Sequence, residues 1–217
     1  MNSWQEITIK RLGYRRITIE WRPIVQRSLL DHILTVQEKI KSNYHHSLIA
    51  TVKTYHTLTL LFDEDVNHFN EIAQNIELLN KQIEREIRPF KNHYIPVIYD
   101  KDSEEMRLLS RILEKTPSEI IQIHSEKRYD VHFFGFVPGF MYLGGLDPQL
   151  FTSRKNSVSR RIKQGSVAIA GNQTGIYPLD SPGGWWVIGS TEIDVQFDRI
   201  HEGDTITFIN VSYDRSN

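Results

Sequence analysis

The sequence contains no cysteine, and this absence excludes two kinds of site. Without thiols the 217-residue chain forms no disulfide framework and carries no thiolate nucleophile. A zinc site would have to use histidine and carboxylate ligands alone. The nine histidines fall at no spacing typical of metal ligands, and no His-Glu-x-x-His motif occurs. We therefore expect no metal ligand set in this chain.

An excess of charge of either sign is also missing. The 26 Lys and Arg residues balance 27 Asp and Glu residues, so the formal net charge is −1. Proteins that bind nucleic acid or anionic membranes attract them through a basic surface, so we predict neither partner. No apolar run approaches the ~18 residues of a membrane span, and the first residues lack the apolar core of a signal peptide. A cytoplasmic location is the expectation.

Three common catalytic motifs are absent as well. The sequence holds no GxxxxGK[ST] phosphate loop, no GxSxG nucleophile elbow and no GxGxxG dinucleotide fingerprint. Nothing in the sequence therefore supports self-contained hydrolysis of ATP or serine-dependent hydrolysis.

What is present begins with a mixed α/β pattern in the first hundred residues. Alternation of apolar and polar residues predicts strands at 15–21, 48–52, 58–62 and 94–99. Apolar residues at helical spacing predict helices at 24–40 and 66–83. This β-α-β-β-α-β order is that of a ferredoxin-like split βαβ domain, which we predict for residues 1–100. The architecture hosts many activities and says little about function.

The second half is rich in glycine and aromatic residues. Ten of the twelve glycines fall between residues 132 and 191, which favours tight turns over helix. Short strands predicted at 130–136, 166–170, 175–177, 185–190, 194–197 and 205–211 indicate a closed barrel or a sandwich. We predict two short leading helices with capping boxes, Asp102 with Glu105 and Thr116 with Glu119. Residues 101–217 thus form the expected second domain.

Two blocks of this half carry a family resemblance. GFVPGFMYLGGLDP, followed by GSVAIAGNQTGIYPLDSPGGWWVIGST, resembles the family of the 5-oxoprolinase B subunit, also called allophanate hydrolase subunit 1. The family includes a sporulation histidine-kinase inhibitor. The resemblance implies a cyclophilin-like β-barrel for the second domain. The fold class expected for the whole chain is therefore α+β, a ferredoxin-like domain followed by a β-barrel.

The first candidate binding segment is HFFGFVPGFMYLGG, which starts at His132. In a purely structural interpretation Pro138 and Gly139 form a turn and the aromatic rings belong to the core. A strand that lies wholly in the core would not need so many of the Gly and Pro residues that form turns. We therefore keep a second interpretation, in which Pro138, Phe140 and Tyr142 line a groove for a ligand or a protein partner.

The second candidate segment is YPLDSPGGWW, which starts at Tyr177. It is either a rigid loop, or a loop whose glycines Gly183 and Gly184 present backbone N–H groups to a carboxylate, phosphate or amide oxygen. In the binding interpretation Tyr177 and Trp185 shape the pocket.

A basic stretch between these segments is either a solvated loop or an anion site, because guanidinium groups bind carboxylate and phosphate in bidentate fashion. The family shows two Pro-Arg steps, then Val-Pro-x-Gly, and later Gly-Arg-Thr-Pro. This chain has at these places Ser153-Arg154, Ser159-Arg160, Ile162-Lys163-Gln164-Gly165 and Gly189-Ser190-Thr191-Glu192. Both arginines of the Pro-Arg steps persist, whereas the three prolines of the first three motifs are missing and the arginine of the last motif is replaced by Ser190.

The resemblance implies a subunit of an ATP-dependent 5-oxoprolinase that opens 5-oxo-L-proline to L-glutamate. Arg154 and Arg160 would hold phosphate or carboxylate, and His124, which matches a family histidine, would transfer a proton or serve as a structural residue. ATP contacts would be shared with the homologous C subunit of the complex and with its A subunit. An alternative is inhibition of a sensor histidine kinase by direct binding. A third hypothesis, prolyl isomerisation of the cyclophilin type, rests on the analogy of the fold alone.

Overall fold

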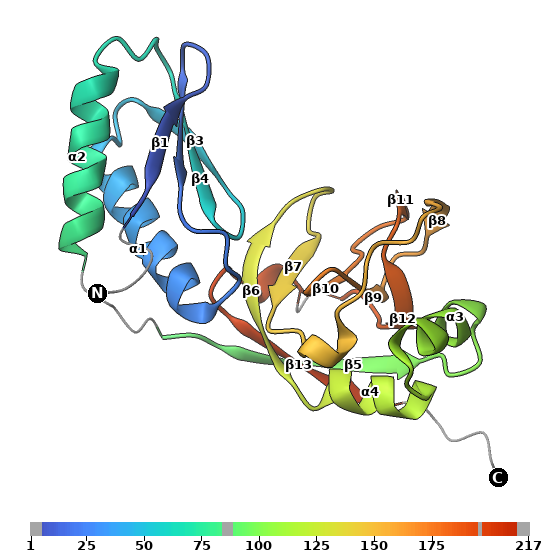
Figure 1. Cartoon of the computed structure of the whole chain (residues 1–217). Helices are drawn as coiled ribbons and strands as arrows, with labels where there is room; N and C mark the ends of the chain where they lie inside the picture. The colour runs from blue at the N-terminus through green and yellow to red at the C-terminus, as the bar shows by residue number, and fades with distance from the viewer. Residues whose placement is uncertain (1–5, 84–88, 195–196, 212–217) are drawn as a thin grey trace. The chain divides into compact units, whose positions relative to one another are not determined.

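The computed structural model describes residues 6–83, 89–194 and 197–211 (Figure 1). The chain divides into two compact units between Pro89 and Phe90. The first unit contains β1 (Thr8–Arg11), β2 (Arg16–Glu20), α1 (Arg27–Asn43), β3 (Leu48–Lys53), β4 (Thr57–Phe62) and α2 (Phe69–Gln82). The second unit contains β5 (Asn92–Tyr99), α3 (Glu104–Leu113), α4 (Pro117–Ser125), β6 (Arg128–Phe134), β7 (Met141–Gly144), η1 (Pro148–Leu150), β8 (Ser159–Ile162), β9 (Ser166–Ala170), β10 (Gln173–Ile176), β11 (Ser181–Gly183), β12 (Trp186–Ser190), η2 (Phe197–Arg199) and β13 (Thr205–Asn210).

The first unit is an antiparallel sheet of order β1-β2-β4-β3 with two helices. Because β2 and β3 both pair antiparallel with β4, they run parallel to each other with β4 between them. This is the predicted split βαβ arrangement. The fourth strand is not the predicted one: β1 occupies the edge beside β2. The expectation that residues 94–99 complete this sheet, and with it a first domain reaching residue 100, is wrong.

The core of the first unit follows the two periodicities. Ile17 and Ile19 of β2 are fully buried, as are Leu58 and Leu60 of β4. A polar contact lies inside this core: the Asn80 Oδ1 accepts hydrogen bonds from the Trp21 Nε1, at 3.0 Å, and from the His32 Nε2, at 2.7 Å. The amide of α2 thereby ties α1 to the segment that follows β2.

The second unit is a closed barrel of order β10-β7-β6-β13-β5-β12-β9, in which β9 pairs back onto β10. The α+β class with a barrel is thus confirmed. The strand predicted at 94–99 lies here as β5, parallel to β13. Its alternation is real, since Ile95 and Val97 point into the barrel core while Tyr94 and Ile98 are exposed. Of the strand predicted at 194–197, residues 195 and 196 lie outside the described residues.

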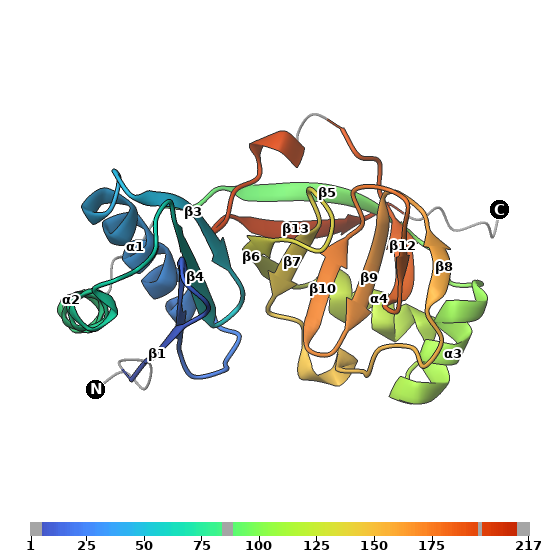
Figure 2. The same ribbon diagram turned by 90° about the horizontal axis from the view of Figure 1, so that it is seen from above.

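Two helices pack against the barrel, and their caps test two sequence predictions. The capping box of Thr116 and Glu119 is confirmed at the start of α4. The box predicted for Asp102 and Glu105 is wrong, because Ser103 caps α3 by accepting a hydrogen bond from the Met106 N–H, at 3.1 Å. This frees the Glu105 carboxylate for contacts with the barrel. Figure 2 shows α3 next to β8 and β12.

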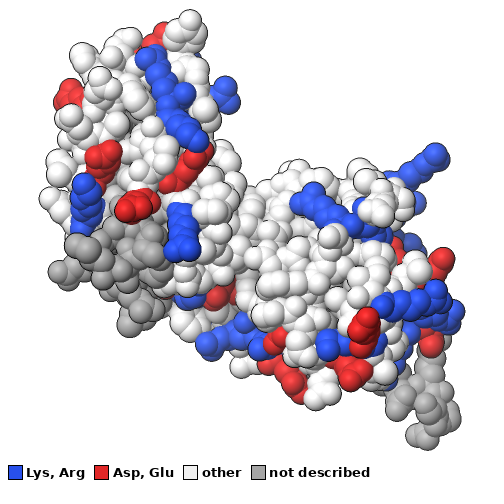
Figure 3. All heavy atoms as spheres, viewed as in Figure 1, with Lys and Arg blue, Asp and Glu red and all other residues white. Residues whose placement is uncertain are grey.

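Charged groups of both signs are dispersed over the face shown in Figure 3, without a broad area of a single sign. This distribution agrees with the near-zero formal net charge of the sequence. Among the described residues, we find no helix with both the length and the apolar character that crossing a membrane requires.

Candidate functional site

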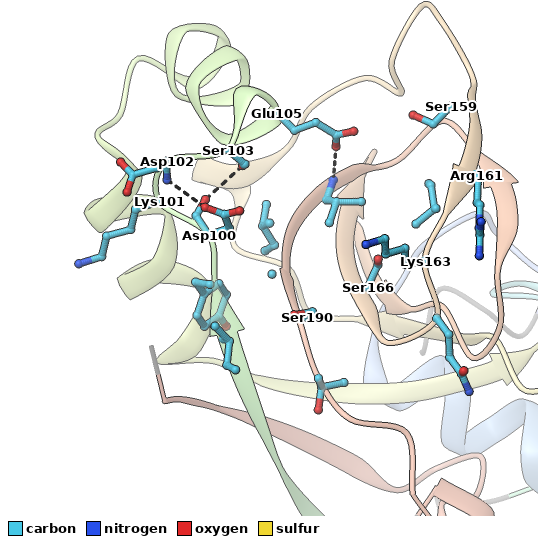
Figure 4. A pocket seen from close by; sticks show the side chains of 18 residues that line it. Asp100, Lys101, Asp102, Ser103, Glu105, Ser159, Arg161, Lys163, Ser166 and Ser190 are labelled. Carbon is cyan, nitrogen blue, oxygen red and sulfur yellow. Dashed lines mark hydrogen bonds between the residues drawn. The ribbon is translucent and has the colours of Figure 1, made fainter. Parts of the chain in front are cut away.

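An open groove of about 1240 Å³ in the second unit is the candidate site (Figure 4). It is lined by three segments of the chain, 98–105, 159–166 and 187–191. The first covers the end of β5 and the start of α3, the second covers β8 and the turn into β9, and the third is the end of β12.

Glu105 fastens the helical wall of the groove to the barrel. Its Oε2 accepts a hydrogen bond from the Val187 N–H, at 2.7 Å, and its Oε1 binds the Lys155 Nζ at 2.6 Å. The same ammonium group donates to the Ser159 Oγ, at 2.8 Å. Sequence analysis missed this role, because the contacts join residues 50 and 82 positions apart and no local pattern encodes them.

Asp180 fastens the opposite wall. Its carboxylate accepts hydrogen bonds from the Gln164 N–H, at 2.8 Å, and from the Arg161 Nε, at 2.7 Å. The Gln164 hydrogen bond and then the Arg161 pairing hold the pKa of Asp180 below its usual value. Arg161 therefore lines the groove with its positive charge paired with the Asp180 carboxylate.

Two glycines allow the strands below the groove to approach closely. Gly165 has a φ of +80°, and a Cβ there would collide with the carbonyl oxygen of Thr191. A Cβ at Gly189 would lie 2.8 Å from the carbonyl oxygen of Ile98. Side chains at either position would push the lining strands apart, so these glycines fix the shape of the groove.

Most residues predicted to bind substrate pack elsewhere, in an aromatic cluster of the barrel. Phe140, Tyr177 and Trp185 are buried to at least 95%, and the Phe140 ring meets the other two edge to face at 5.0 and 5.4 Å. Burial raises the pKa of Tyr177 to about 12. Tyr142 is half-buried at the edge of the cluster, where its ring lies 4.8 Å from that of Phe140. None of the four lines the groove. The structure thus places these residues in a packed cluster outside the groove, and their expected ligand-lining role stays a prediction.

Of the glycine pair in the second candidate segment, Gly183 allows close packing, whereas a Cβ at Gly184 would meet nothing nearer than 3.8 Å. A Cβ at Gly183 would collide with the hydroxyl group of Tyr177 and lie 2.7 Å from the Ile162 Cδ1. The carbonyl oxygen of Gly184 accepts a hydrogen bond from the Lys155 N–H, at 2.7 Å. Close approach of the ring, instead of an anion cradle, is the physical reason for glycine at Gly183.

The two predicted anion-binding arginines are exposed, and neither lines the groove. Arg154 lies in the segment between η1 and β8. Its positive charge acts to lower the pKa values of Tyr142 and Tyr177, against the larger effect of burial, which raises them. Arg160 lies on β8, between two groove residues. The structure therefore does not bring these arginines together with the groove.

The loop between β6 and β7 holds the remaining predicted residue, Pro138, which is exposed. Beside it Phe136 is 59% exposed and has a φ of +64°, a left-handed conformation that is strained for a bulky side chain. Its ring meets those of Phe140 and Tyr177 edge to face, at 5.7 and 6.5 Å. An exposed aromatic group thus covers the buried cluster.

His124 lies in the barrel core on α4 and is fully buried. Its Nδ1 is 2.8 Å from the Tyr99 hydroxyl and its Nε2 is 2.9 Å from the Thr174 hydroxyl, while its ring stacks on Phe208 at 4.9 Å. Burial lowers its pKa to about 3, so the ring is neutral at physiological pH. Both ring nitrogens have hydrogen-bond partners and the ring packs in the core, while the proton-transfer role that the resemblance implies stays a prediction.

Comparison with known proteins gives consistent relatives. Residues 7–206 match the family described as carboxyltransferase domain, subdomain C and D. A Haemophilus influenzae protein named as the B subunit of 5-oxoprolinase is 37% identical over 172 residues, covering 75% of this chain and 79% of the relative. A Bacillus subtilis protein of the same name is 28% identical over 222 residues, covering 94% and 92%.

Solved structures share the fold. The crystal structure of TTHA0988 matches 92% of this chain with a TM-score of 0.76 and 26% identity, and the match spans 40% of that longer chain. The Kluyveromyces lactis urea carboxylase matches 95% of this chain, and 22% of its own, with a TM-score of 0.75. At 16% identity, this second likeness shows the fold alone.

Proposed function

The chain belongs to the family of the 5-oxoprolinase B subunit, and from this membership we propose that it is a non-autonomous subunit of an ATP-dependent 5-oxoprolinase. The proposed reaction opens the lactam of 5-oxo-L-proline to give L-glutamate. The single observation that carries the proposal is the 37% identity to a relative of that name over three quarters of the chain.

A lactam carbonyl is a weak electrophile because the amide nitrogen donates electron density to it. ATP would transfer its γ-phosphoryl group to the amide oxygen and leave as ADP. Water would then add to the carbon, and the C–N bond would break with the nitrogen taking up a proton, which leaves an acyl phosphate. A second water would release phosphate and give L-glutamate. Positioned cations and hydrogen-bond donors would stabilise the charge that develops on oxygen. The groove offers such groups in Lys163 and in the hydroxyls of Ser166 and Ser190.

The groove also suggests why the chain would work only in an assembly. It is open to solvent, and its lining contains no glycine-rich phosphate loop among the described residues. Activation of an amide by phosphoryl transfer needs water to be excluded until the activated group has formed. We propose that the homologous C subunit lies over the groove and that the A subunit supplies further catalytic residues, with the ATP contacts shared among the chains.

Reconstitution tests the proposal. The full chain is purified alone and together with the C and A subunits from the same source, and 5-oxoproline-dependent ADP and glutamate formation are measured. We expect both products only from the complete mixture, in a ratio of one to one. Omission of each subunit in turn is the matched control. A complete mixture that forms no glutamate contradicts the proposal.

A second candidate function is inhibition of a sensor histidine kinase by direct binding. The observation that favours it is Phe136, an exposed aromatic side chain on a strained loop beside Pro138. Backbone strain of this kind is often retained at recognition sites, and aromatic anchors commonly dominate protein interfaces. Kinase autophosphorylation measured with the wild-type chain and with Phe136→Ser distinguishes the two candidates, since only this second function predicts inhibition that the substitution removes.

A further inference from the structure

Three polar side chains gather in one part of the groove without being used by the fold. Ser166 of β9 and Ser190 of β12 are directly opposite each other in the antiparallel pairing of these strands. Lys163 precedes Ser166 by one turn, which is closed by a hydrogen bond from the Ser166 N–H to the Lys163 carbonyl oxygen, at 3.2 Å. All three line the groove, and Figure 4 shows them between the α3 wall and the β8 wall.

Ser166 is the unusual member of the three. It is 6% exposed, and its hydroxyl group has no hydrogen-bond partner among residues 6–83, 89–194 and 197–211. Its backbone is fully used, since the Ser166 carbonyl oxygen accepts the Tyr177 N–H at 2.9 Å. The hydroxyl oxygen is not among the fully buried unpaired atoms of the described residues, so it borders the groove and can donate to a group bound there. Ser190 lies opposite, with a hydroxyl that likewise has no partner in the described part of the chain.

The cationic groups of the groove divide into bound and available ones. Arg161 is paired with Asp180, and Lys155, which does not line the groove, is paired with the lining residue Glu105. The Lys163 side chain makes no hydrogen bond or ion pair within the described ranges, although its charge helps to lower the pKa of Asp180. Lys101, on the α3 side of the groove, likewise has no such partner in the described part of the chain, but Lys163 is the available cation on the side that carries the two serine hydroxyls.

We propose that Lys163, Ser166 and Ser190 form an oxyanion subsite, which binds a carboxylate or phosphate group through one cation and two hydroxyl donors. This inference deepens the proposed function and rests on it in one respect: the oxyanion is assigned to the carboxylate of 5-oxo-L-proline. The subsite would position the lactam ring along the groove. The same donors suit the phosphoryl group released in the reaction, so the test separates the two sources.

The test measures ligand binding by the full chain, independently of catalysis. The 15N-labelled chain is titrated with 5-oxo-L-proline, with 2-pyrrolidinone, which is the same lactam without the carboxylate, and with inorganic phosphate. We expect 5-oxo-L-proline to shift the amide signals of segments 163–166 and 189–191, and 2-pyrrolidinone to bind at least tenfold more weakly. Phosphate shifting the same signals, in place of 5-oxo-L-proline, would assign the subsite to phosphate.

Variants identify the residues that act. Lys163→Gln is expected to weaken binding at least tenfold and Ser166→Ala several-fold, whereas Lys163→Arg keeps the charge and retains binding. Lys101→Gln is the matched control, because Lys101 is an exposed lysine on the opposite wall of the same groove. Circular dichroism checks that each variant is folded. Equal effects of Lys163→Gln and Lys101→Gln would overturn the assignment of Lys163.

The outcomes also separate this inference from the proposed function. If the complete assembly forms glutamate but neither oxyanion binds at Lys163, the subsite is wrong and the proposed function stands. If an oxyanion binds in a Lys163-dependent manner but the assembly is inert, the subsite stands and the 5-oxoprolinase role does not. Absence of binding of either oxyanion to the wild-type chain overturns the subsite.

Discussion

The carboxylate of Glu105 accepts a hydrogen bond from the backbone N–H of Val187, 2.7 Å away and 82 residues later in the chain. The same carboxylate pairs with Lys155, whose side chain is 9% exposed. One side chain near the start of α3 therefore satisfies a strand N–H and a largely buried ammonium group. This arrangement makes a direct prediction about stability.

Glu105→Ala is expected to destabilise the second unit by about 2–3 kcal/mol, because it leaves the Val187 N–H and the Lys155 ammonium group without their partner. Urea unfolding followed by circular dichroism measures the change. Glu104→Ala is the control, since Glu104 is exposed on the same helical turn, and it should stay within about 0.5 kcal/mol of wild type. Equal stabilities of the two variants would contradict the bridging role.

Gly165→Ala is expected to cost about 3 kcal/mol or more, because the added methyl group meets the Thr191 carbonyl oxygen at a backbone φ of +80°. Gly171→Ala separates the steric effect from the conformational one. Gly171 has a φ of +60° but nothing within 4 Å of its Cβ position, so a loss of about 1 kcal/mol is expected. Thermal unfolding of both variants measures the difference; a comparable loss in each would rule out the steric explanation.

His124 predicts a pH dependence of stability. Its pKa is about 3 in the folded chain and 6.5 when exposed, so the unfolded chain binds more protons between these values. Stability is therefore expected to fall as the pH drops below 6.5, by about 2 kcal/mol at pH 5 for this group alone. His32, whose pKa is also lowered by burial, adds to the trend in the first unit. His124→Asn should be less stable at neutral pH and should flatten the dependence. Denaturant unfolding at several pH values measures it, and an unchanged slope in the variant would argue against a neutral buried ring.

Ser190→Arg places a guanidinium group beside Lys163 and Ser166, at a position where the family resemblance predicts arginine. It is expected to strengthen oxyanion binding about tenfold, which corresponds to ~1.4 kcal/mol, because a second charge-assisted donor is added. Ser118→Arg, at an exposed position of α4, adds the same charge outside the groove and should leave binding unchanged. Titration with 5-oxo-L-proline and phosphate compares the two, and a gain in both would indicate a nonspecific effect of net charge.

The sequence predicted most elements because local periodicity reports which face of a segment is buried. Ile17, Ile19, Leu58 and Leu60 alternate as expected and form the core of the first sheet. Pairing is a different matter. The alternation of β5 is equally clear, but it does not say which sheet the strand joins, and hydrogen bonds to β13, more than a hundred residues away, decide this.

The candidate site was less predictable, because its residues are ordinary ones brought together by long-range contacts. The glycines near Tyr177 suggested an anion cradle, whereas Gly183 is needed so that the tyrosine ring can pack. The aromatic-rich pattern around Phe140 led to the prediction of a binding groove there, whereas the groove of the structure is lined by other residues. Lys163 lay in a basic stretch that was identified, but only the β9–β12 pairing places it beside two serine hydroxyls.

The parallel pairing of β5 with β13 also constrains the order in which the protein can be made. All helices and strands of the first unit are encoded by residue 82, so that unit can form early during synthesis. The barrel lacks the neighbour of both β5 and β6 until residues 205–210 have emerged from the ribosome. Between the synthesis of β12 and that of β13, a nascent chain therefore carries an unclosed sheet with two open edges, and loss of the last strand would leave that sheet permanently exposed to aggregation.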